Sequence, residues 1–62
     1  MTKTDWIISI ENSAAIVASV LGQETVDFIL QNYGAKSIEE LDPHDYELIF
    51  GELFQYEADL NN

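Results

Sequence analysis

Residues 4–21 read TDWIISIENSAAIVASVL, the longest stretch of helical hydrophobic spacing in the chain. At about 100° per residue, the apolar side chains gather on one side of a helix: Trp6, Ile7, Ile10, Ala14, Val17, Ala18 and Leu21. Thr4 suits the N-cap, Asp5 the first turn near the positive end of the helix dipole, and Gly22 the position after the last turn. The sequence therefore predicts one helix over about residues 4–21.

A strand over residues 6–10 is the competing interpretation, because Trp6 to Ile10 are mostly β-favouring residues. A strand needs a partner strand, and no other segment has the alternating apolar pattern of one. The helix is therefore the favoured interpretation of this stretch.

The next amphipathic segment follows directly after Gly22. Val26, Ile29, Leu30 and Tyr33 are spaced i, i+3, i+4 and i+7, which is the stripe of a helix over about residues 23–33. Gly34 is a natural stop for that helix, since glycine readily adopts the left-handed conformation that ends helices.

Two start signals come next along the chain. Ser37 and Glu40 have the spacing of a capping box, which predicts a short helical turn near residues 37–41. Asp42 is then a good N-cap and Pro43 a good first helical residue. They predict a last helix over about residues 43–60, with Tyr46, Ile49, Phe50, Leu53 and Leu60 on one face.

These elements predict an all-α fold, a compact three-helix bundle with helices at about 4–21, 23–33 and 43–60. We expect residues 1–62 to form a single domain. The long first and last helices should pack against each other, and the second helix should cross them.

The composition restricts how so short a chain is stabilised. A domain of 62 residues buries a small fraction of its surface and is marginally stable. The chain has no cysteine and one histidine, which excludes disulfides, thiolate metal sites and multi-histidine metal sites. We expect no cofactor, and a partner chain is the support that remains.

The net charge of −10 restricts the partners. It repels phosphate backbones and anionic membrane surfaces, so we expect neither direct nucleic-acid binding nor membrane binding. Basic proteins are attracted instead. No apolar run has the length of a membrane span, and the N-terminus has no pattern of a secretory signal.

The sequence predicts no enzyme and shows no sign of a small-molecule substrate. His44 is the one candidate proton shuttle, but no serine, threonine or cysteine lies in a nucleophile motif. Asp42, Asp45 and Glu47 lack the spacing and the glycine of a calcium loop. We therefore expect His44 to be an exposed residue in the first turn of a helix.

Several apolar residues lie off the main stripes of their helices and predict a second buried surface, a homodimer seam or a docking face. Glu57 is unusual because it projects between Tyr46 and Phe50, inside the apolar arc of the last helix, where a carboxylate needs a cationic partner or access to water. The candidate interface comprises Ile8, Ile16, Phe28, Leu48, Phe54, Tyr56 and Glu57.

The acidic residues are concentrated in the second half of the chain. Residues 36–62 carry eight acids and one lysine, a net −7, against −3 for residues 1–35. The candidate acidic surface comprises Glu39, Glu40, Asp45, Glu47 and Glu52. Such a surface serves either recognition of a basic partner or solubility alone.

A resemblance rests on five segments: Gly22-Gln23-Glu24, Phe28-Ile29-Leu30, Tyr33-Gly34-Ala35, Ser37 to Pro43, and Phe50 to Leu60. With these segments, about residues 13–60 resemble short proteins carried on conjugative transposons and related mobile elements of Gram-positive gut bacteria. That group has no assigned activity. The resemblance implies a bacterial cytoplasmic accessory protein.

Two functions are compatible with these features. The first is a non-catalytic protein-interaction module that self-associates, as a homodimer. The second is an acidic inhibitor that mimics the charge of a nucleic acid and occupies the binding surface of a DNA- or RNA-binding protein.

Overall fold

The first helix, α1, extends from Lys3 to Leu21 and confirms the helical interpretation of residues 6–10. Its N-cap is Thr2 and not Thr4, as the sequence had suggested. The Asp5 amide donates to Thr2 Oγ1 at 3.2 Å, and the Thr2 amide donates to Asp5 Oδ2 at 3.3 Å. Thr4 has no such reciprocal partner, because the residue three positions later is Ile7, which has no acceptor.

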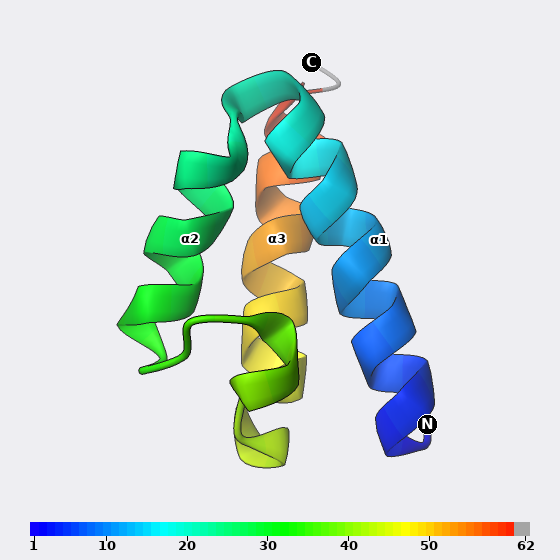
Figure 1. Ribbon diagram of the computed structural model, residues 1–62. Helices are drawn as coiled ribbons and strands as arrows, with labels where there is room; N and C mark the ends of the chain where they lie inside the picture. Colours follow the sequence, from blue (N-terminus) through cyan, green and yellow to red (C-terminus); the bar gives the residue numbers. More distant parts are fainter. Residues whose placement is uncertain (61–62) are drawn as a thin grey trace.

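The computed structural model describes residues 1–60 as three α-helices and two 3₁₀ turns, with no strand in that range (Figure 1). After α1 come α2 (Gln23–Asn32), η1 (Ile38–Glu40), η2 (Pro43–Asp45) and α3 (Tyr46–Leu60). The all-α three-helix bundle predicted from the sequence is therefore confirmed.

Helix α1 is the element against which the others pack. It packs most extensively against α3 and next against α2. In Figure 1, α1 and α3 run in the same direction, and α2 runs in the opposite direction on the left of the view. The reversal between α1 and α2 takes place at Gly22 alone, which has φ 93° and ψ 152°, a conformation that side chains with a Cβ strongly disfavour.

Helix α2 ends in a Schellman motif built on Gly34. The Ala35 amide donates to the Leu30 carbonyl and the Gly34 amide to the Gln31 carbonyl, at 3.1 and 3.0 Å. Gly34 has φ 73°, the left-handed conformation that this motif requires. Ala35 and Leu30 are both buried, so the end of α2 is tied to the core.

The capping box predicted at Ser37 is absent. The Glu40 amide donates to the Ser37 carbonyl at 3.1 Å, as in a 3₁₀ turn, so that amide is not left for the Ser37 side chain. Asp42 does act as a cap, and its carboxylate accepts from the His44 amide at 2.9 Å. The first turn of the predicted last helix is the 3₁₀ turn η2, and α-helix begins at Tyr46.

The core lies where the three helices and the 35–41 segment meet. Its buried apolar residues are Ile10, Ala14, Val17, Val26, Ile29, Leu30, Ala35, Leu41, Tyr46, Ile49 and Leu53. Leu21, predicted on the core stripe, is 42% exposed and is the last residue of α1, so no further turn of the helix covers it. No helix within residues 1–60 is both long and apolar enough to cross a membrane.

Candidate protein-interaction surfaces

The off-stripe apolar side chains are exposed on the surface. Phe28, Leu48 and Phe54 are 60%, 62% and 59% exposed, and Ile8 and Ile16 are about half exposed. Val20 is equally exposed but was not among the interface residues predicted from the sequence. It also lies off the main stripe of α1, so the criterion used for Ile8 and Ile16 could have identified it.

These residues do not share one surface. Phe28 lies on the side of α2 opposite Val26 and Leu30, and Leu48 lies well away from the core-facing side of α3. Ile8 likewise lies opposite Ile10 and Val17 on α1. Each of the three therefore projects from a different helix in a different direction.

Phe54 differs, because it is the last of a row of aromatic rings that joins α1 to α3. The rings of Trp6 and Phe50 meet edge to face with centroids 5.9 Å apart, and Phe54 follows 6.4 Å from Phe50. At 100° per residue, Ile16 and Val20 lie on the same flank of α1 as Trp6. We name this surface, formed by Trp6, Ile16, Val20, Phe50 and Phe54, the α1–α3 face.

Tyr56 and Glu57 are half-buried and lie on different flanks of α3. Tyr56 packs against the core, which makes it a core residue more than a surface anchor. Glu57 follows Phe50 by two turns and so lies on the flank that faces α1. Its intermediate exposure leaves part of this carboxyl-bearing side chain accessible beside the α1–α3 face.

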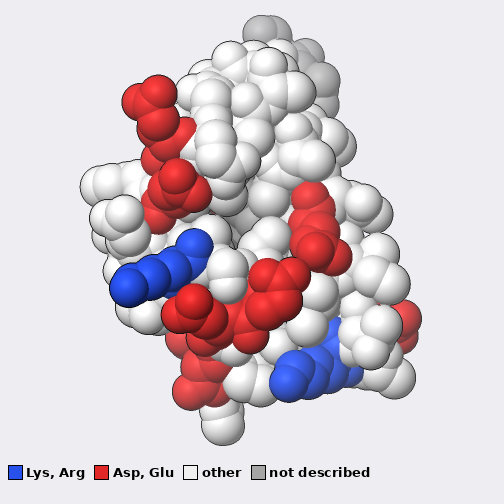
Figure 2. Space-filling model, in the orientation of Figure 1, with Lys and Arg blue, Asp and Glu red and all other residues white. Residues whose placement is uncertain are grey.

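The candidate acidic surface is accessible. Glu39, Glu40, Glu47 and Glu52 are exposed and Asp45 is half-buried. Among residues 1–60, the only carboxylate oxygen within 4.0 Å of a basic side-chain nitrogen is Asp42 Oδ1, which lies 3.0 Å from His44 Nδ1. Figure 2 shows acids along the left edge and across the middle and lower parts of the molecule, whereas the upper part of α1 carries no charge in this view, as expected from residues 12–23.

The electrostatic effect of these acids is visible at Tyr33, which lies at the end of α2. Its pKa is raised above the ordinary value by partial burial first, and then by the negative charges of Glu52 and Asp45. The chain thus brings two acids of its last 20 residues to the end of α2.

His44 lies in the turn η2, beside the cap residue Asp42. Its side chain is 95% exposed and its one hydrogen-bond partner is the cap residue Asp42. The His44 backbone amide, followed by its ring, holds the pKa of the Asp42 carboxyl below the ordinary value. Within residues 1–60, no three His, Cys, Asp or Glu side chains are grouped in a way that holds a metal ion.

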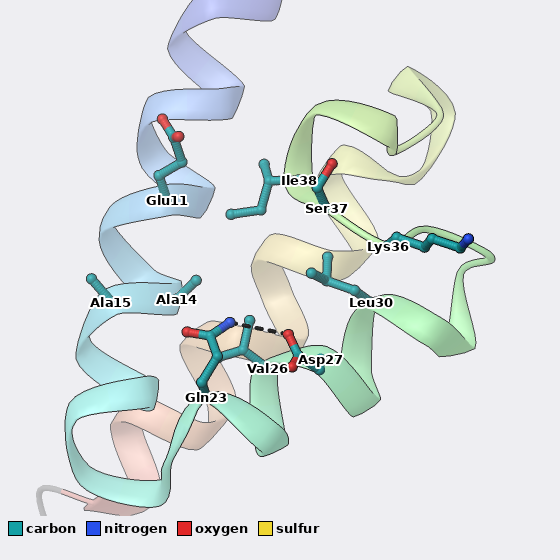
Figure 3. Close-up of a pocket in the computed structure, with 10 residues that line it drawn as sticks. All are labelled: Glu11, Ala14, Ala15, Gln23, Val26, Asp27, Leu30, Lys36, Ser37 and Ile38. Atoms are coloured by element: carbon teal, nitrogen blue, oxygen red, sulfur yellow. Dashed lines mark hydrogen bonds between the residues drawn. The ribbon is translucent and has the colours of Figure 1, made fainter.

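A cleft between α1 and α2 was not identified from the sequence. It has a volume of about 370 Å³ and is closed at one end by the 36–38 segment (Figure 3). Its lining comprises Glu11, Ala14, Ala15, Gln23, Val26, Asp27, Leu30, Lys36, Ser37 and Ile38. Because three separate segments form it, no local pattern signals it.

One buried polar group lacks a partner. Tyr46 is 2% exposed, and within the described part of the chain its hydroxyl makes no hydrogen bond. It does not line the cleft.

Comparison with known proteins gives no relative. No protein-family model matches the chain, and neither a curated protein nor a solved structure is significantly similar to it.

Proposed function

We propose that this chain is a non-catalytic protein-interaction module that self-associates through the α1–α3 face. The observation that carries the proposal is the aromatic row from Trp6 through Phe50 to Phe54, whose last ring is 59% exposed. Ile16 and Val20 are also exposed, and helical geometry places them on the same flank of α1 as Trp6. Exposed apolar side chains gathered on one face are typical of interaction sites.

A second copy is a suitable occupant because of where the charge lies. Two molecules of net charge −10 repel each other wherever their acids meet. Between Glu11 and Glu24, α1 and the Gly22 link carry no charged residue, so the α1 part of the face brings no like charges together. On the α3 part, the half-buried Glu57 is the acid that lies beside the face. A standard interface buries about 800 Å² per partner. That is roughly a fifth of the 4123 Å² of accessible surface, a large gain for so small a domain.

The biological setting that fits this proposal is that of a cytoplasmic accessory protein of a bacterial mobile element. The support is the resemblance of residues 13–60, together with the absence of cysteine. An accessory protein without catalytic groups acts by binding.

Sedimentation equilibrium over a concentration series tests the proposal. We expect a dimer mass in the micromolar range. The I16Q/F54Q variant should raise the dissociation constant about a hundredfold or more. The reason is that each lost apolar contact, worth on the order of 1 kcal/mol, occurs twice in a symmetric dimer.

The matched control is F28Q/L48Q, which removes one aromatic and one aliphatic side chain of similar exposure from other sides of the molecule. It should leave the dissociation constant unchanged. A monomer at high micromolar concentration contradicts self-association, and equal weakening by both variants contradicts the assignment to the α1–α3 face.

The second candidate function is that of an acidic mimic of nucleic acid. It is favoured by the unpaired, accessible carboxylates of Glu39, Glu40, Glu47 and Glu52. Replacing these four and Asp45 with glutamine or asparagine should abolish binding to a basic nucleic-acid-binding protein and flatten its salt dependence. Unchanged binding at every salt concentration rejects the mimic.

A further inference from the structure

Gly22 is the only residue between α1 and α2. Helix α1 ends at Leu21 and α2 begins at Gln23, so the chain reverses its direction without a loop. Figure 1 shows the two helices meeting at one end of the molecule. The reversal depends on φ 93° and ψ 152° at Gly22, a backbone conformation that is essentially restricted to glycine. The hairpin of α1 and α2 therefore depends on the backbone of one residue.

The hydrogen bonds at this link are close to those of a continuous helix. The Gly22 amide donates to the Ala18 carbonyl at 2.9 Å, which is the i to i−4 bond of an α-helix. The Leu21 carbonyl accepts from the Thr25 hydroxyl at 3.2 Å, whereas in a continuous helix it accepts from the Thr25 amide. No side chain caps the first turn of α2. Helical angles at Gly22 would give the first amides of α2 the last carbonyls of α1 as partners.

The surface beside Gly22 is apolar and uncharged, although the chain as a whole carries a net charge of −10. Val20 and Leu21 are 61% and 42% exposed. No charged residue lies between Glu11 and Glu24. A second copy can therefore approach this end of the molecule with less charge repulsion than elsewhere, and contact between the two copies removes apolar surface from water.

We propose that Gly22 is a hinge through which two copies of this chain exchange their α1 helices. In the exchanged dimer, α1 and α2 of each chain form one continuous helix over residues 3–32, and α1 packs against α2 and α3 of the other copy. The buried residues Ile10, Ala14 and Val17 keep the same neighbours, now supplied by the other copy. The exchanged form differs from the monomer at the hinge, where the strain at Gly22 is released and the Val20-Leu21 segments of the two copies meet.

The exchange goes beyond the proposed association through the α1–α3 face, and the two are separable. Opening the hinge removes α1 from the core, so the exchange requires extensive unfolding and is slow in both directions. A dimer formed through the α1–α3 face separates on dilution, whereas an exchanged dimer persists. The I16Q/F54Q variant leaves the hinge and the buried core unchanged, so it should weaken the first kind of dimer and not the second.

The test is to refold the chain from denaturant at millimolar and at micromolar concentration, and to separate the diluted products by gel filtration. We expect a persistent dimer from the millimolar sample. Gly22→Ala should lower its dissociation constant about a thousandfold, because in each of the two chains alanine is strained in the hairpin and favourable in the continuous helix. In dilute protein, the same strain lowers the stability of the monomer. If neither wild type nor Gly22→Ala gives a persistent dimer, the proposal is wrong.

Two further variants distinguish the hinge from a general loss of stability. Gly34→Ala adds the same methyl group at the other glycine of positive φ, 73°, and leaves the link between α1 and α2 as it is. It should give no persistent dimer. Insertion of Gly-Gly after Gly22 relieves the tight link and interrupts the continuous helix, so it should abolish the persistent dimer of the wild type. Equal dimer formation by Gly34→Ala and Gly22→Ala overturns the assignment to the hinge.

The path of the chain in the dimer is measured with spin labels. Because the chain has no cysteine, Asn12→Cys with Gln31→Cys places one label at an exposed position of α1 and one at an exposed position of α2. In a continuous helix these positions are about 28 Å apart along the axis, at 1.5 Å per residue. In the monomer they lie on two neighbouring helices. Labelled chains are refolded with excess unlabelled chains, so that electron paramagnetic resonance reports the distance within one chain. A dimer fraction with the same distance as the monomer overturns the exchange.

Discussion

Trp6 and Phe50, 44 positions apart in sequence, lie with ring centroids 5.9 Å apart and planes inclined by 71°. This edge-to-face contact joins the first turns of α1 to the first turns of α3. It also places the single tryptophan of the chain within the α1–α3 face, where its fluorescence reports on that surface.

Phe50→Leu should therefore lower the free energy of unfolding by about 0.5–1.5 kcal/mol beyond the lost area, the usual value of an aromatic pair. Trp6 emission should move to longer wavelength, because its ring loses a neighbour that shields it from water. Phe28→Leu is the control, since Phe28 is 60% exposed and should leave both measurements unchanged. If the Trp6 emission spectrum of Phe50→Leu is the same as that of wild type, the rings of Trp6 and Phe50 are not in contact.

Glycine-to-alanine substitutions should have opposite signs at two positions. Gly22→Ala should destabilise the fold by about 1–3 kcal/mol, because φ 93° with ψ 152° is strained for any residue with a Cβ. Gly51→Ala lies within α3, where an added Cβ meets nothing within 4 Å. It should stabilise the fold by about 0.5–1 kcal/mol. Chemical denaturation measures the free energy of unfolding of both variants. If both substitutions stabilise the fold, or both destabilise it, the backbone conformations assigned to Gly22 and Gly51 are wrong.

Asp42→Ala should lower the melting temperature by a few degrees at neutral pH, because it removes the N-cap of the last helical segment. The effect should depend on pH in a defined direction. The folded pKa of Asp42 is lowered, so its stabilisation is present above the unfolded value near 3.9 and is lost as pH falls through the folded value. The gap between wild type and Asp42→Ala should therefore narrow in acid. If the difference in melting temperature is unchanged at the lowest pH, the protonated Asp42 carboxyl caps the helix as effectively as the carboxylate does.

The ionisation of Tyr33 should report its acidic neighbours. Subtracting the absorbance titration of Tyr33→Phe from that of wild type isolates this phenol, whose midpoint should lie above 10. Glu52→Gln should move the midpoint downward, since it removes a negative charge that opposes phenolate formation. Because burial and the two negative charges disfavour the phenolate in the folded state, the free energy of unfolding should fall as pH rises from the unfolded pKa of about 10 through the folded pKa. If the midpoint of the Tyr33 titration is the same in Glu52→Gln as in wild type, Glu52 is too far from Tyr33 to affect its pKa.

Tyr46→Phe should leave stability unchanged or raise it by up to about 1 kcal/mol. The Tyr46 hydroxyl is buried without a hydrogen-bond partner in the described residues, and removing such a group removes its desolvation cost. Thermal melts of the two proteins measure the difference. A loss of more than about 1 kcal/mol shows that the hydroxyl is hydrogen-bonded in solution.

Local signals in the sequence were sufficient for most of the fold. Helical periodicity placed α1, α2 and α3 within a few residues of their observed ends, and Gly22, Gly34 and Asp42 were correctly assigned to their turns and cap. The errors were also local. Thr2 and Thr4 both precede a helical pattern, and only the hydrogen bonds between Thr2 and Asp5 decide between them. At Ser37, the spacing of a capping box occurs in a 3₁₀ turn too short to use it.

The sequence by itself determined the helices, the net charge of −10 and which side of each helix is apolar, because these depend on residue type and on spacing within one turn. Only the tertiary structure decided which exposed residues lie together. The pairing of Trp6 with Phe50 depends on how α1 packs against α3. The cleft depends on three segments that meet only after the chain has reversed at Gly22 and Gly34. Periodicity fixes directions within a helix, whereas a site formed between helices depends on how their core side chains pack.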